Sequence, residues 1–382
     1  MSIDVSWPPK LLLPQNDPRH QTFQSQCFFL QDTWLNSYIG EWDPSTFYGQ
    51  ISVANDPQNA CALLSYSRRK SKLGIPYVSL GFNEASEQQI QNITLEFNDF
   101  LITSLEKTQD TSESGNILFS KRMRSALSVL LNRDDWHEIR LNAFSSEAAQ
   151  QTESLARELG LISTVFSTNE TYWIDLERIR THHSASYIAS RSANTRSQLR
   201  RALRNVEKTI GPCQIESAQT ISQAHQWFQE LGIFHLRKWE DSSVYEGFKN
   251  GRFVDFHLKI IEELWHSGSI QILRLRAGDR AIAYLYNFVS RGHIYFNLSG
   301  IDFNQDEINK PGMLAHWMAV DHSLAIGCHT YDFMAGTNRY KQSLCTNKTQ
   351  QVSLRLRRKT IPFLAEDILR RFKRLRLFKA NI

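Results

Sequence analysis

The stretch from His293 to Leu344 constrains the fold of this chain most, because strand and helix signals alternate within a short distance. It predicts a strand at His293–Ser299, a polar loop, a helix at Met313–Ile326 and a second strand at Thr330–Met334. A strand, a helix and a strand in this order form a crossover unit whose two strands lie parallel. Since ligands of α/β sheets bind outside the carboxyl ends of parallel strands, the stretch also predicts where a site would lie.

Glycines and polar residues lie at the start of the expected helix and after the second expected strand of this unit. Pro311 and Gly312 lie where the helix is expected to begin, so backbone N–H groups of its first turn would be available to an anion. Gly336 follows the second strand, and Tyr340 and Lys341 come directly after it. We therefore expect an anion-binding site formed by the helix start and the strand ends.

The rest of the second half supports a mixed sheet. Strands expected at Ile270–Arg276 and Ile282–Val289 lead over short turns into the strand at His293, which predicts an antiparallel meander. Three helices are expected before the meander and one strand after the crossover: about 185–208, 222–239, 254–266 and 351–358. The first helix carries a basic stripe that is either a solvated face or a surface for an anionic carrier or substrate: Arg196, Arg200, Arg204 and Lys208.

The first half has a similar mixture of signals. Apolar spacing predicts helices at Ile90–Leu105 and Ala148–Leu159, and strands are expected near residues 60–67, 136–141 and 171–176. Because 382 residues exceed what one hydrophobic core commonly serves, we expect two domains, at 1–176 and 177–360. Residues 361–382 predict a basic amphipathic helix, either docked or in contact with a membrane surface or an acidic carrier protein.

Composition narrows the class of protein. The five cysteines are far apart and form no CxxC pair, so no metal site is expected and a reducing compartment fits. The net charge of +5 permits an anionic ligand without indicating nucleic acid. The start of the chain does not read as a signal peptide, and no run approaches the length of a membrane span, so we expect a cytoplasmic protein.

Four stretches of the second half carry a resemblance to a known family. They are the Arg-rich helix from Ser192 to Gly211, Ala281-Ile282-Ala283, Lys310-Pro311-Gly312-Met313-Leu314, and Asp332-Phe333-Met334-Ala335-Gly336 followed by Tyr340-Lys341. Their order and spacing resemble the GNAT acyltransferases, and within these the CelD/BcsL-type acetyltransferase family. In one respect the chain departs from the wider superfamily: residues 309–313 contain a single glycine, where most GNATs have a glycine-richer pyrophosphate loop.

The resemblance implies a fold and a donor. It implies an α/β fold (α+β, with a mixed sheet) made of two tandem GNAT-like domains. Each domain would be a twisted mixed sheet flanked by helices, and the N-terminal domain would be degenerate. It also implies acetyl-CoA or another acyl-CoA as co-substrate, with a carrier-protein donor as the alternative. The donor would lie between the strands ending at Ser299 and Met334. Its pyrophosphate would meet the start of the following helix, with residues Lys310, Gly312, Met313, Leu314 and Lys341.

Catalytic and acceptor residues follow from the same resemblance. Tyr340 would protonate the leaving thiolate, since a phenol with a pKa of about 10 suits that role; the alternative is a packing tyrosine. Asp332 and His235 are candidate general bases, each with a structural alternative, and Asp302 is a further candidate. Arg237 and Asn338 would contact the acceptor.

Three functions remain open from the sequence. The first is an N- or O-acyltransferase acting on an amino sugar, a surface-polysaccharide precursor or a small amine in a biosynthetic pathway. The second is a Fem-like aminoacyl-tRNA-dependent transferase, in which the basic stripe and the tail would contact RNA phosphates. The third is a non-catalytic tandem GNAT that binds a partner or a membrane. A monomer is the expected state.

Overall fold

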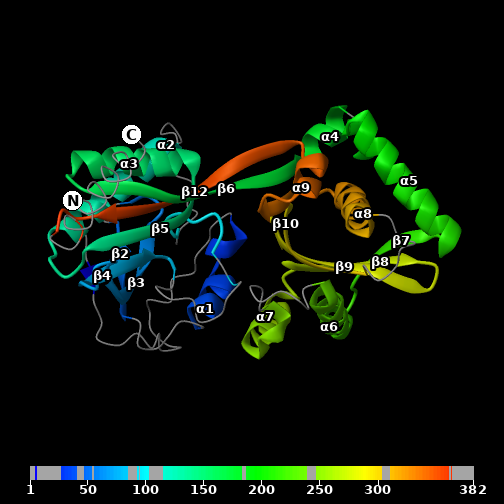
Figure 1. Ribbon diagram of the computed structural model, residues 1–382, viewed down its shortest axis with the longest axis horizontal. Coiled ribbons are helices and arrows are strands. Elements are labelled where there is room, and N and C mark those ends of the chain that lie inside the picture. Colours follow the sequence, from blue (N-terminus) through cyan, green and yellow to red (C-terminus); the bar gives the residue numbers. More distant parts are fainter. Residues whose placement is uncertain are drawn as a thin grey trace, which may run out of the picture. The chain divides into compact units, whose positions relative to one another are not determined.

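The computed structural model describes residues 5–6, 27–40, 47–53, 56–84, 93, 95–102, 115–182, 186–238, 247–302, 310–360 and 363. By its contacts the chain divides into two compact units. Unit 1 comprises Met1–Gln89, Thr94–Thr168 and Gln350–Ile382, and unit 2 comprises Ile90–Ile93 and Asn169–Thr349. Both are mixed α/β, as expected (Figure 1). Whether the predicted parts 1–176, 177–360 and 361–382 fold separately stays a prediction.

Unit 1 contains a mixed sheet with the strand order β1-β2-β3-β4-β5-β12. Its strands are β1 (Val5–Ser6), β2 (Phe47–Ser52), β3 (Cys61–Lys70), β4 (Pro76–Phe82), β5 (Glu138–Ser145) and the later part of β12 (Asn347–Arg357). β4 and β5 are parallel, and helix α2 (Gly115–Leu131) connects them. Helices α1 (Asp32–Gly40) and α3 (Ser146–Glu158) complete the unit. Its core includes Phe82, Met123, Leu127 and Phe144.

Unit 2 contains a sheet with the order β6-β11-β10-β9-β8-β7. Its elements are the later part of β6 (Ile162–Asp175), α4 (Leu176–His182), α5 (Ala193–Thr209), β7 (Cys213–Ser217), α6 (Ile221–Lys238), α7 (Gly251–Leu264), β8 (Ile270–Ala277), β9 (Arg280–Ser290), β10 (His293–Ile301), α8 (Pro311–Ala325), β11 (Thr330–Ala335) and α9 (Arg339–Leu344). β8, β9 and β10 form the expected antiparallel meander, and β10 and β11 are parallel across α8, as expected.

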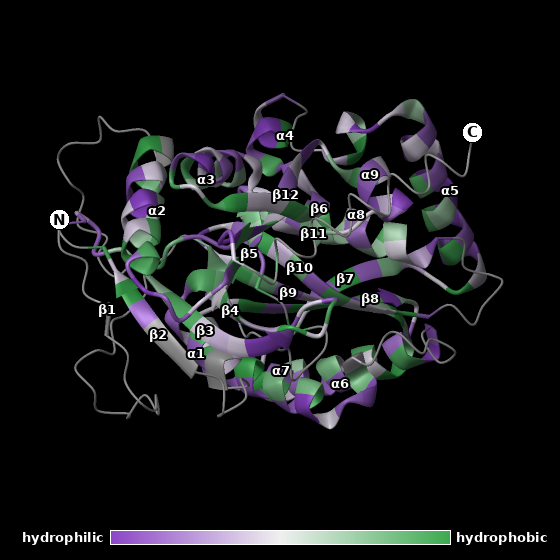
Figure 2. Ribbon diagram, turned by 60° about the vertical axis from the view of Figure 1, so that its left-hand side comes forward, coloured by the Kyte–Doolittle hydropathy of each residue, from purple (hydrophilic) through white to green (hydrophobic). Residues whose placement is uncertain are grey.

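Helices cover both faces of the unit 2 sheet. α6 and α7 lie on one face, and α5 and α8 on the other (Figure 1). The α8 face holds a core of aliphatic residues from the helices and from β8 to β11, including Leu199, Leu275, Leu285 and Leu314. Along α6 and α7 hydrophilic and hydrophobic residues alternate (Figure 2), which is typical of helices that pack one face against a sheet.

Two long strands contribute residues to both units. β6 passes from unit 1 to unit 2 at Thr168, and β12 passes from unit 2 to unit 1 at Gln350. In unit 2, β6 pairs antiparallel with β11; in unit 1, β12 pairs antiparallel with β5. Each unit therefore completes its sheet with a strand that arrives from the other half of the sequence.

Helix α6 packs unusually close to β10 at Gly300. A Cβ atom on Gly300 would lie 2.3 Å from the carbonyl oxygen of Leu231 and 2.7 Å from its Cα. Only glycine leaves room for the helix backbone at that distance. One residue before it, the carbonyl of Ser299 accepts a hydrogen bond from Nδ1 of His235 on α6, at 2.9 Å. α6 and β10 are thus fixed together next to the predicted site.

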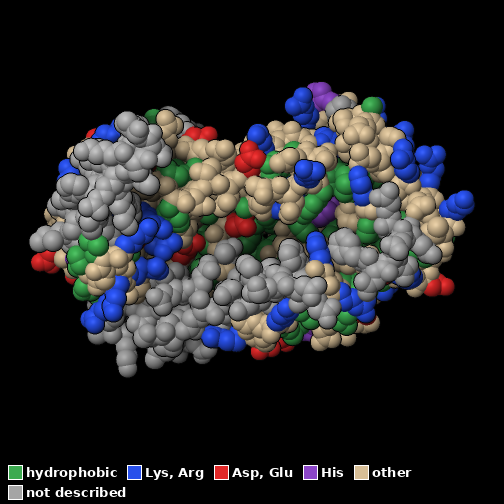
Figure 3. Space-filling view, viewed as in Figure 1, with side chains coloured by type: hydrophobic (Ala, Val, Ile, Leu, Met, Phe, Trp, Pro, Cys, Tyr) green, Lys and Arg blue, Asp and Glu red, His purple; other side chains and the backbone are tan. Residues whose placement is uncertain are grey.

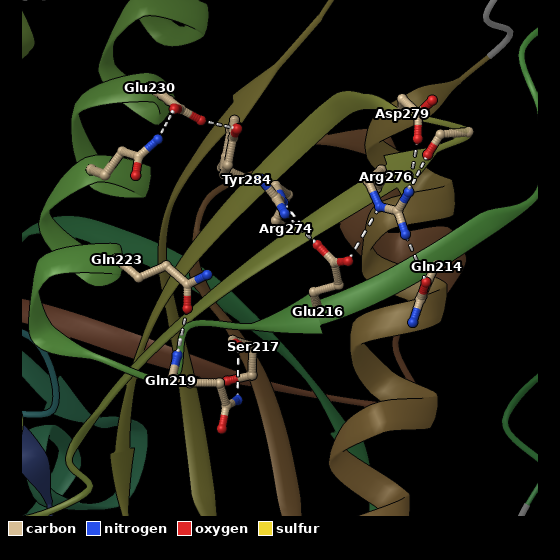
Figure 4. Close-up of polar contacts among 12 residues, drawn as sticks. Gln214, Glu216, Ser217, Gln219, Gln223, Glu230, Arg274, Arg276, Asp279 and Tyr284 are labelled. Carbon is tan, nitrogen blue, oxygen red and sulfur yellow. Dashed lines mark hydrogen bonds and ion pairs between the residues drawn. The ribbon is translucent and has the colours of Figure 1, made fainter.

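An ion-pair network ties down the outer strands on the α6 face (Figure 4). Glu216 on β7 accepts hydrogen bonds from Arg274 and Arg276 on β8, and the Arg274 guanidinium also lies 4.5 Å from the Trp227 ring centroid on α6. Tyr284 on β9 donates to Glu230 on α6. The network holds α6 over β7, β8 and β9 with polar as well as apolar contacts.

Several predicted elements need correction. The helix predicted at Ile90–Leu105 is wrong over the described residues 95–102, where Phe97 has a φ of 55° and Leu101 forms a β-bridge to Cys61. The Arg-rich helix begins at Ala193, not near residue 185, because Ser192 caps it with a hydrogen bond from the Thr195 N–H. The predicted amphipathic tail lies outside the described residues apart from Phe363.

Candidate functional site

The parallel strands β10 and β11 pair over only three residues before they separate. The last pair is Tyr295 with Asp332. Immediately afterwards both strands carry a bulge: Asn297 is the extra residue in β10 against β9, and Phe333 and Met334 stand against a single residue of β6. Since a bulge bends a strand and ends regular pairing, these two irregularities account for the opening at this point.

Asp332 and Lys341 stabilise the bend in β11. The Asp332 carboxylate accepts a hydrogen bond from the Met334 N–H at 2.7 Å, and Met334 has a φ of 63°. The Lys341 ammonium donates to the carbonyl of Ala335 at 2.7 Å and is 6% exposed. Lys341 is therefore directed at the bend, whereas the resemblance implies that it binds the donor. As a donor-binding residue it stays a prediction.

Helix α8 begins at the open end of the two strands. Lys310 adopts a left-handed conformation with a φ of 59°, and Pro311 is the first helical residue. The N–H groups of Met313 and Leu314 point back to the Lys310 carbonyl, whereas a Cβ atom on Gly312 would meet only the Ile301 side chain, at 3.8 Å. The exposed Lys310 ammonium reaches Gln198 of α5 at 2.6 Å. A positive charge thus lies at the first helical turn, but the Met313 and Leu314 N–H groups already donate to Lys310, so this turn leaves fewer donors for an anion than the sequence predicts.

On the α8 face, an aromatic cluster surrounds His316. The His316 ring stacks on Tyr340 with 5.2 Å between centroids, and its Nδ1 lies 3.0 Å from the Tyr331 hydroxyl. Phe296 and Phe333 contact the ring edge-on. Burial, aided by the nearby Lys341 charge, lowers the pKa of His316 to about 3, so the imidazole is neutral.

Tyr340 belongs to this cluster and keeps its proton. Burial raises the pKa of Tyr340 above its usual value. Its helix, α9, is fixed at the far end because the Tyr187 hydroxyl donates to the Leu344 carbonyl at 2.6 Å and Arg191 donates to the same oxygen at 3.0 Å. Tyr340 is therefore a positioned hydrogen-bond donor beside Phe333, directly after β11 opens.

The opposite face of the same strands holds a different group. Asp332, 3% exposed, faces Nε2 of His293 at 3.5 Å. The His293 ring stacks on Tyr295 with 4.0 Å between centroids. His235 lies on this α6 face through its bond to Ser299, and burial lowers the pKa of His235. The opening between β10 and β11 is therefore flanked by a phenol on one face and by a carboxylate and imidazoles on the other.

The remaining predicted residues lie at the periphery. Arg237 is exposed near the end of α6 and stacks over Phe234, with 5.6 Å to the ring centroid. Asn338 is exposed and precedes α9 without a side-chain capping bond. Asp302 pairs with Arg280. Among the described residues, Asp332 and Lys341 hold the bend of β11, His235 is bonded to Ser299 and Tyr340 follows β11, whereas Arg237 and Asn338 are exposed; the roles of all of them stay predictions.

Two residues of the site, His293 and His316, are not predicted from the sequence. His293 begins β10, and His316 lies one turn into α8. Neither belongs to a motif, since their contacts are with residues of neighbouring strands. One signal in the sequence is available for His293: it begins a strand, and the neighbouring strand of the predicted crossover contains an aspartate.

Basic side chains gather over α5 (Figure 3). Its buried face is Thr195, Leu199, Ala202 and Val206, whereas Arg200, Arg201, Arg204 and Lys208 are exposed. Arg196 is partly buried and donates to the Arg191 carbonyl. Most of the predicted stripe is therefore on the surface of unit 2.

Comparison with known proteins concerns this same region. Residues 193–342 match the family model of the acetyltransferase (GNAT) domain. The match covers 150 of the 382 residues (193 to 342), all of them within unit 2. The matched region contains the bulged strands, the start of α8 and α9. None of the curated proteins matches the sequence.

Solved structures show likeness in fold. FemX matches with a TM-score of 0.55 at 10% identity, covering 87% of this chain and 93% of its own. A conserved protein of unknown function from Bacteroides thetaiotaomicron VPI-5482 matches with 0.48 at 8% identity, covering 88% and 93%. A tandem GNAT protein from the clavulanic acid biosynthesis pathway matches with 0.39 at 8% identity, covering 84% and 85%. At 10% identity the likeness to FemX concerns the fold alone.

Two further observations bear on the class of protein. Within the described residues, no group of three or more His, Cys, Asp or Glu side chains could hold a metal ion. Across the same residues, the helices are too short or too polar to cross a membrane.

Proposed function

We propose that this protein transfers an acyl group directly from a coenzyme A thioester to an amine or hydroxyl of a sugar, a polysaccharide precursor or another small metabolite. The observation that carries the proposal is the opening between β10 and β11 inside the acetyltransferase domain, with the start of α8 at its open end. The narrower assignment to the CelD/BcsL-type family and cytoplasmic biosynthesis are parts of the same proposal.

The residues around the opening suit the needs of acyl transfer. The donor would lie between the separated strands, with its pyrophosphate near Lys310, Gly312, Met313 and Leu314. Tyr340, whose pKa is raised by burial, would hydrogen-bond the sulfur and protonate the leaving thiolate. Asp332 lies on the other face, where an acceptor amine would lose its proton. Acceptor and donor would meet at the point where pairing ends, which supplies catalysis by orientation.

Calorimetric titration with acetyl-CoA and with free coenzyme A tests the donor. We expect binding that Lys310→Ala weakens roughly tenfold, since one charge-assisted contact to a phosphate at the surface is lost. Lys259→Ala on α7 is the matched control, because Lys259 is exposed and pairs only with Glu263 at 3.8 Å among the described contacts. Release of free thiol with a panel of amines then tests transfer. Absence of heat with both ligands would contradict the coenzyme A donor.

The exposed arginines of α5 support a second candidate, a transferase that takes an aminoacyl group from tRNA. This candidate predicts binding of bulk tRNA that falls steeply with salt and that the double substitution Arg200→Ser with Arg204→Ser weakens. If the variant binds tRNA as the native protein does, or if neither binds, the tRNA-dependent candidate is wrong.

An acyl-carrier protein as donor would also bind the exposed arginines of α5. Release of free thiol from an acylated carrier protein distinguishes this donor from tRNA and from coenzyme A.

A further inference from the structure

His293 begins β10 opposite Thr330, and its side chain reaches along the strand to Asp332, which belongs to the last pair before β10 and β11 separate. Their side chains approach to 3.5 Å between Nε2 and Oδ2, and the second Asp332 oxygen is held by the Met334 N–H. Asp332 is fixed by that bond and by its burial, whereas the His293 side chain is 31% exposed. The pair therefore has one rigid, buried member and one member that a ligand can reach.

We propose that His293, oriented by Asp332, is the general base that accepts the proton of the acceptor amine. The proposal rests on the proposed acyl transfer and adds the residue that activates the acceptor. His293 and Tyr295 share one face of β10, because alternate residues of a strand do. The stack on Tyr295, which is opposite Asp332 in the last strand pair, brings the imidazole toward the opening.

The two ring nitrogens of His293 have different surroundings. Nε2 is buried, lies 3.5 Å from the Asp332 carboxylate and makes no hydrogen bond among the described residues; we assign the proton of the neutral imidazole to it because the carboxylate is an acceptor. The lone pair of Nδ1 is then left for a substrate proton, and an Asp332 carboxylate nearby stabilises the imidazolium that forms. The other histidines near the opening are less suited. His235 already uses its Nδ1 on Ser299, and His316 is 2% exposed on the opposite face.

Few other charged groups border the pair in the described part of the chain. Tyr295 lies on the ring itself, and Asp332 is the group from β11. The β9 residue opposite His293 is Ser290, which does not titrate. At the adjoining turn, Arg291 is exposed and His329 pairs with Glu177 at 2.9 Å. Asp332 is therefore the charged group that lies against the His293 imidazole among the described residues.

In the proposed transfer from the thioester to the amine, atoms and charges balance. An acceptor ammonium gives one proton to Nδ1 of His293 and becomes a neutral amine, whose lone pair attacks the thioester carbonyl carbon. The C–N bond forms, the C–S bond breaks, and the sulfur takes the proton of Tyr340. The second proton of the attacking nitrogen restores Tyr340, and His293 releases its proton to solvent. The products are an amide, a free thiol and one proton.

The test compares acceptors that differ in their need for a base. Thiol release from acetyl-CoA is followed with an alkylamine, which is protonated at neutral pH, and with an arylamine, which is already neutral. His293→Gln is expected to lower kcat/KM with the alkylamine by about 100-fold or more and with the arylamine far less. Asp332→Asn is expected to lower the alkylamine rate less than His293→Gln, and imidazole added to His293→Ala to restore part of it.

His329→Gln is the matched control, since His329 is an exposed histidine beside the same turn, and we expect native rates with both acceptors. Urea unfolding of each variant shows whether it is folded. Equal losses with the two acceptors, or native rates for His293→Gln, would overturn the role of His293 and leave the transfer function standing. Calorimetric binding of acetyl-CoA without thiol release from any acceptor would overturn both the transfer function and this assignment.

Discussion

The close contact between Gly300 and α6 makes a sharp prediction for Gly300→Ala. The added methyl carbon would lie 2.3 Å from the Leu231 carbonyl oxygen, 2.7 Å from its Cα and 2.9 Å from its carbonyl carbon. All three atoms belong to the helix backbone, so no side chain can rotate out of the way. Restoring ordinary contact at 3.4 Å needs a separation of about 1.1 Å (3.4 minus 2.3) between α6 and β10 at this point.

Such a displacement has an energetic and a functional consequence. Inserting a methyl group into a filled space costs about 1–3 kcal/mol of unfolding free energy. The bond from His235 to the Ser299 carbonyl, now 2.9 Å, would lengthen with the same movement. Because β10 forms one side of the opening, we also expect Gly300→Ala to weaken acetyl-CoA binding while leaving the helix start at Lys310 unchanged.

Urea unfolding at equilibrium measures the effect, with Gly251→Ala as the matched control. A methyl group on Gly251, the first residue of α7, meets no atom of the described residues within 4 Å, and alanine favours helix. We expect Gly251→Ala to be neutral or stabilising and Gly300→Ala to shift the midpoint to lower urea. Equal midpoints for native protein and Gly300→Ala would refute the packing argument and with it the view that α6 fixes β10.

Three further predictions concern single side chains. Tyr340→Phe is expected to lower the rate of thiol release about 100-fold with little change in acetyl-CoA affinity. Because burial raises the pKa of Tyr340, the rate of the native protein should show no loss of this acid up to about pH 10. An unchanged rate for Tyr340→Phe would mean that Tyr340 serves only in packing. Burial lowers the pKa of His257 to about 3 in the folded protein. Because the unfolded chain takes up this proton near pH 6.5, the free energy of unfolding declines as pH falls from about 6.5 toward 3. His257→Phe should therefore make that decline shallower by about 1.4 kcal/mol per pH unit in unfolding free energy, whereas replacement of the exposed His266 should not. Glu216→Gln removes the charge shared by Arg274 and Arg276 (Figure 4) and should cost about 1 kcal/mol in urea unfolding, with a smaller loss at high salt.

Local signals explain what could be predicted of the fold. The meander is predictable because its strands are apolar and its turns are short. The crossover is predictable because an apolar helix, α8, separates its two apolar strands. The helix predicted over residues 90–105 fails for the opposite reason. Its apolar residues have helical spacing, but over 95–102 the chain packs them as an extended segment, with Leu101 bridged to Cys61. Tertiary pairing overrides the local pattern there.

The exchanged strands could not be predicted. β6 pairs with β11, and β12 with β5, across 155 and 206 residues of sequence (Thr330 with Asp175, Gln351 with Ser145). A strand's own residues specify its faces and its length, but they do not specify which distant strand lies beside it. β7 is not predicted either, because its five residues are partly polar at the edge of the sheet.

The candidate site shows the same limit in finer detail. From alternation alone, Asp332, Met334 and Gly336 should share one face of β11, as Tyr295 and Asn297 should on β10. The bulges at Asn297 and Met334 break that alternation within two residues of the last strand pair. They open the sheet beyond the last strand pair, whereas Asp332 and His293 lie before the bulges on the α6 face and Tyr340 lies beside His316 on the α8 face. The proposed acid and base lie on opposite sides of the opening, and the opening depends on two bulges for which strand propensity gives no signal.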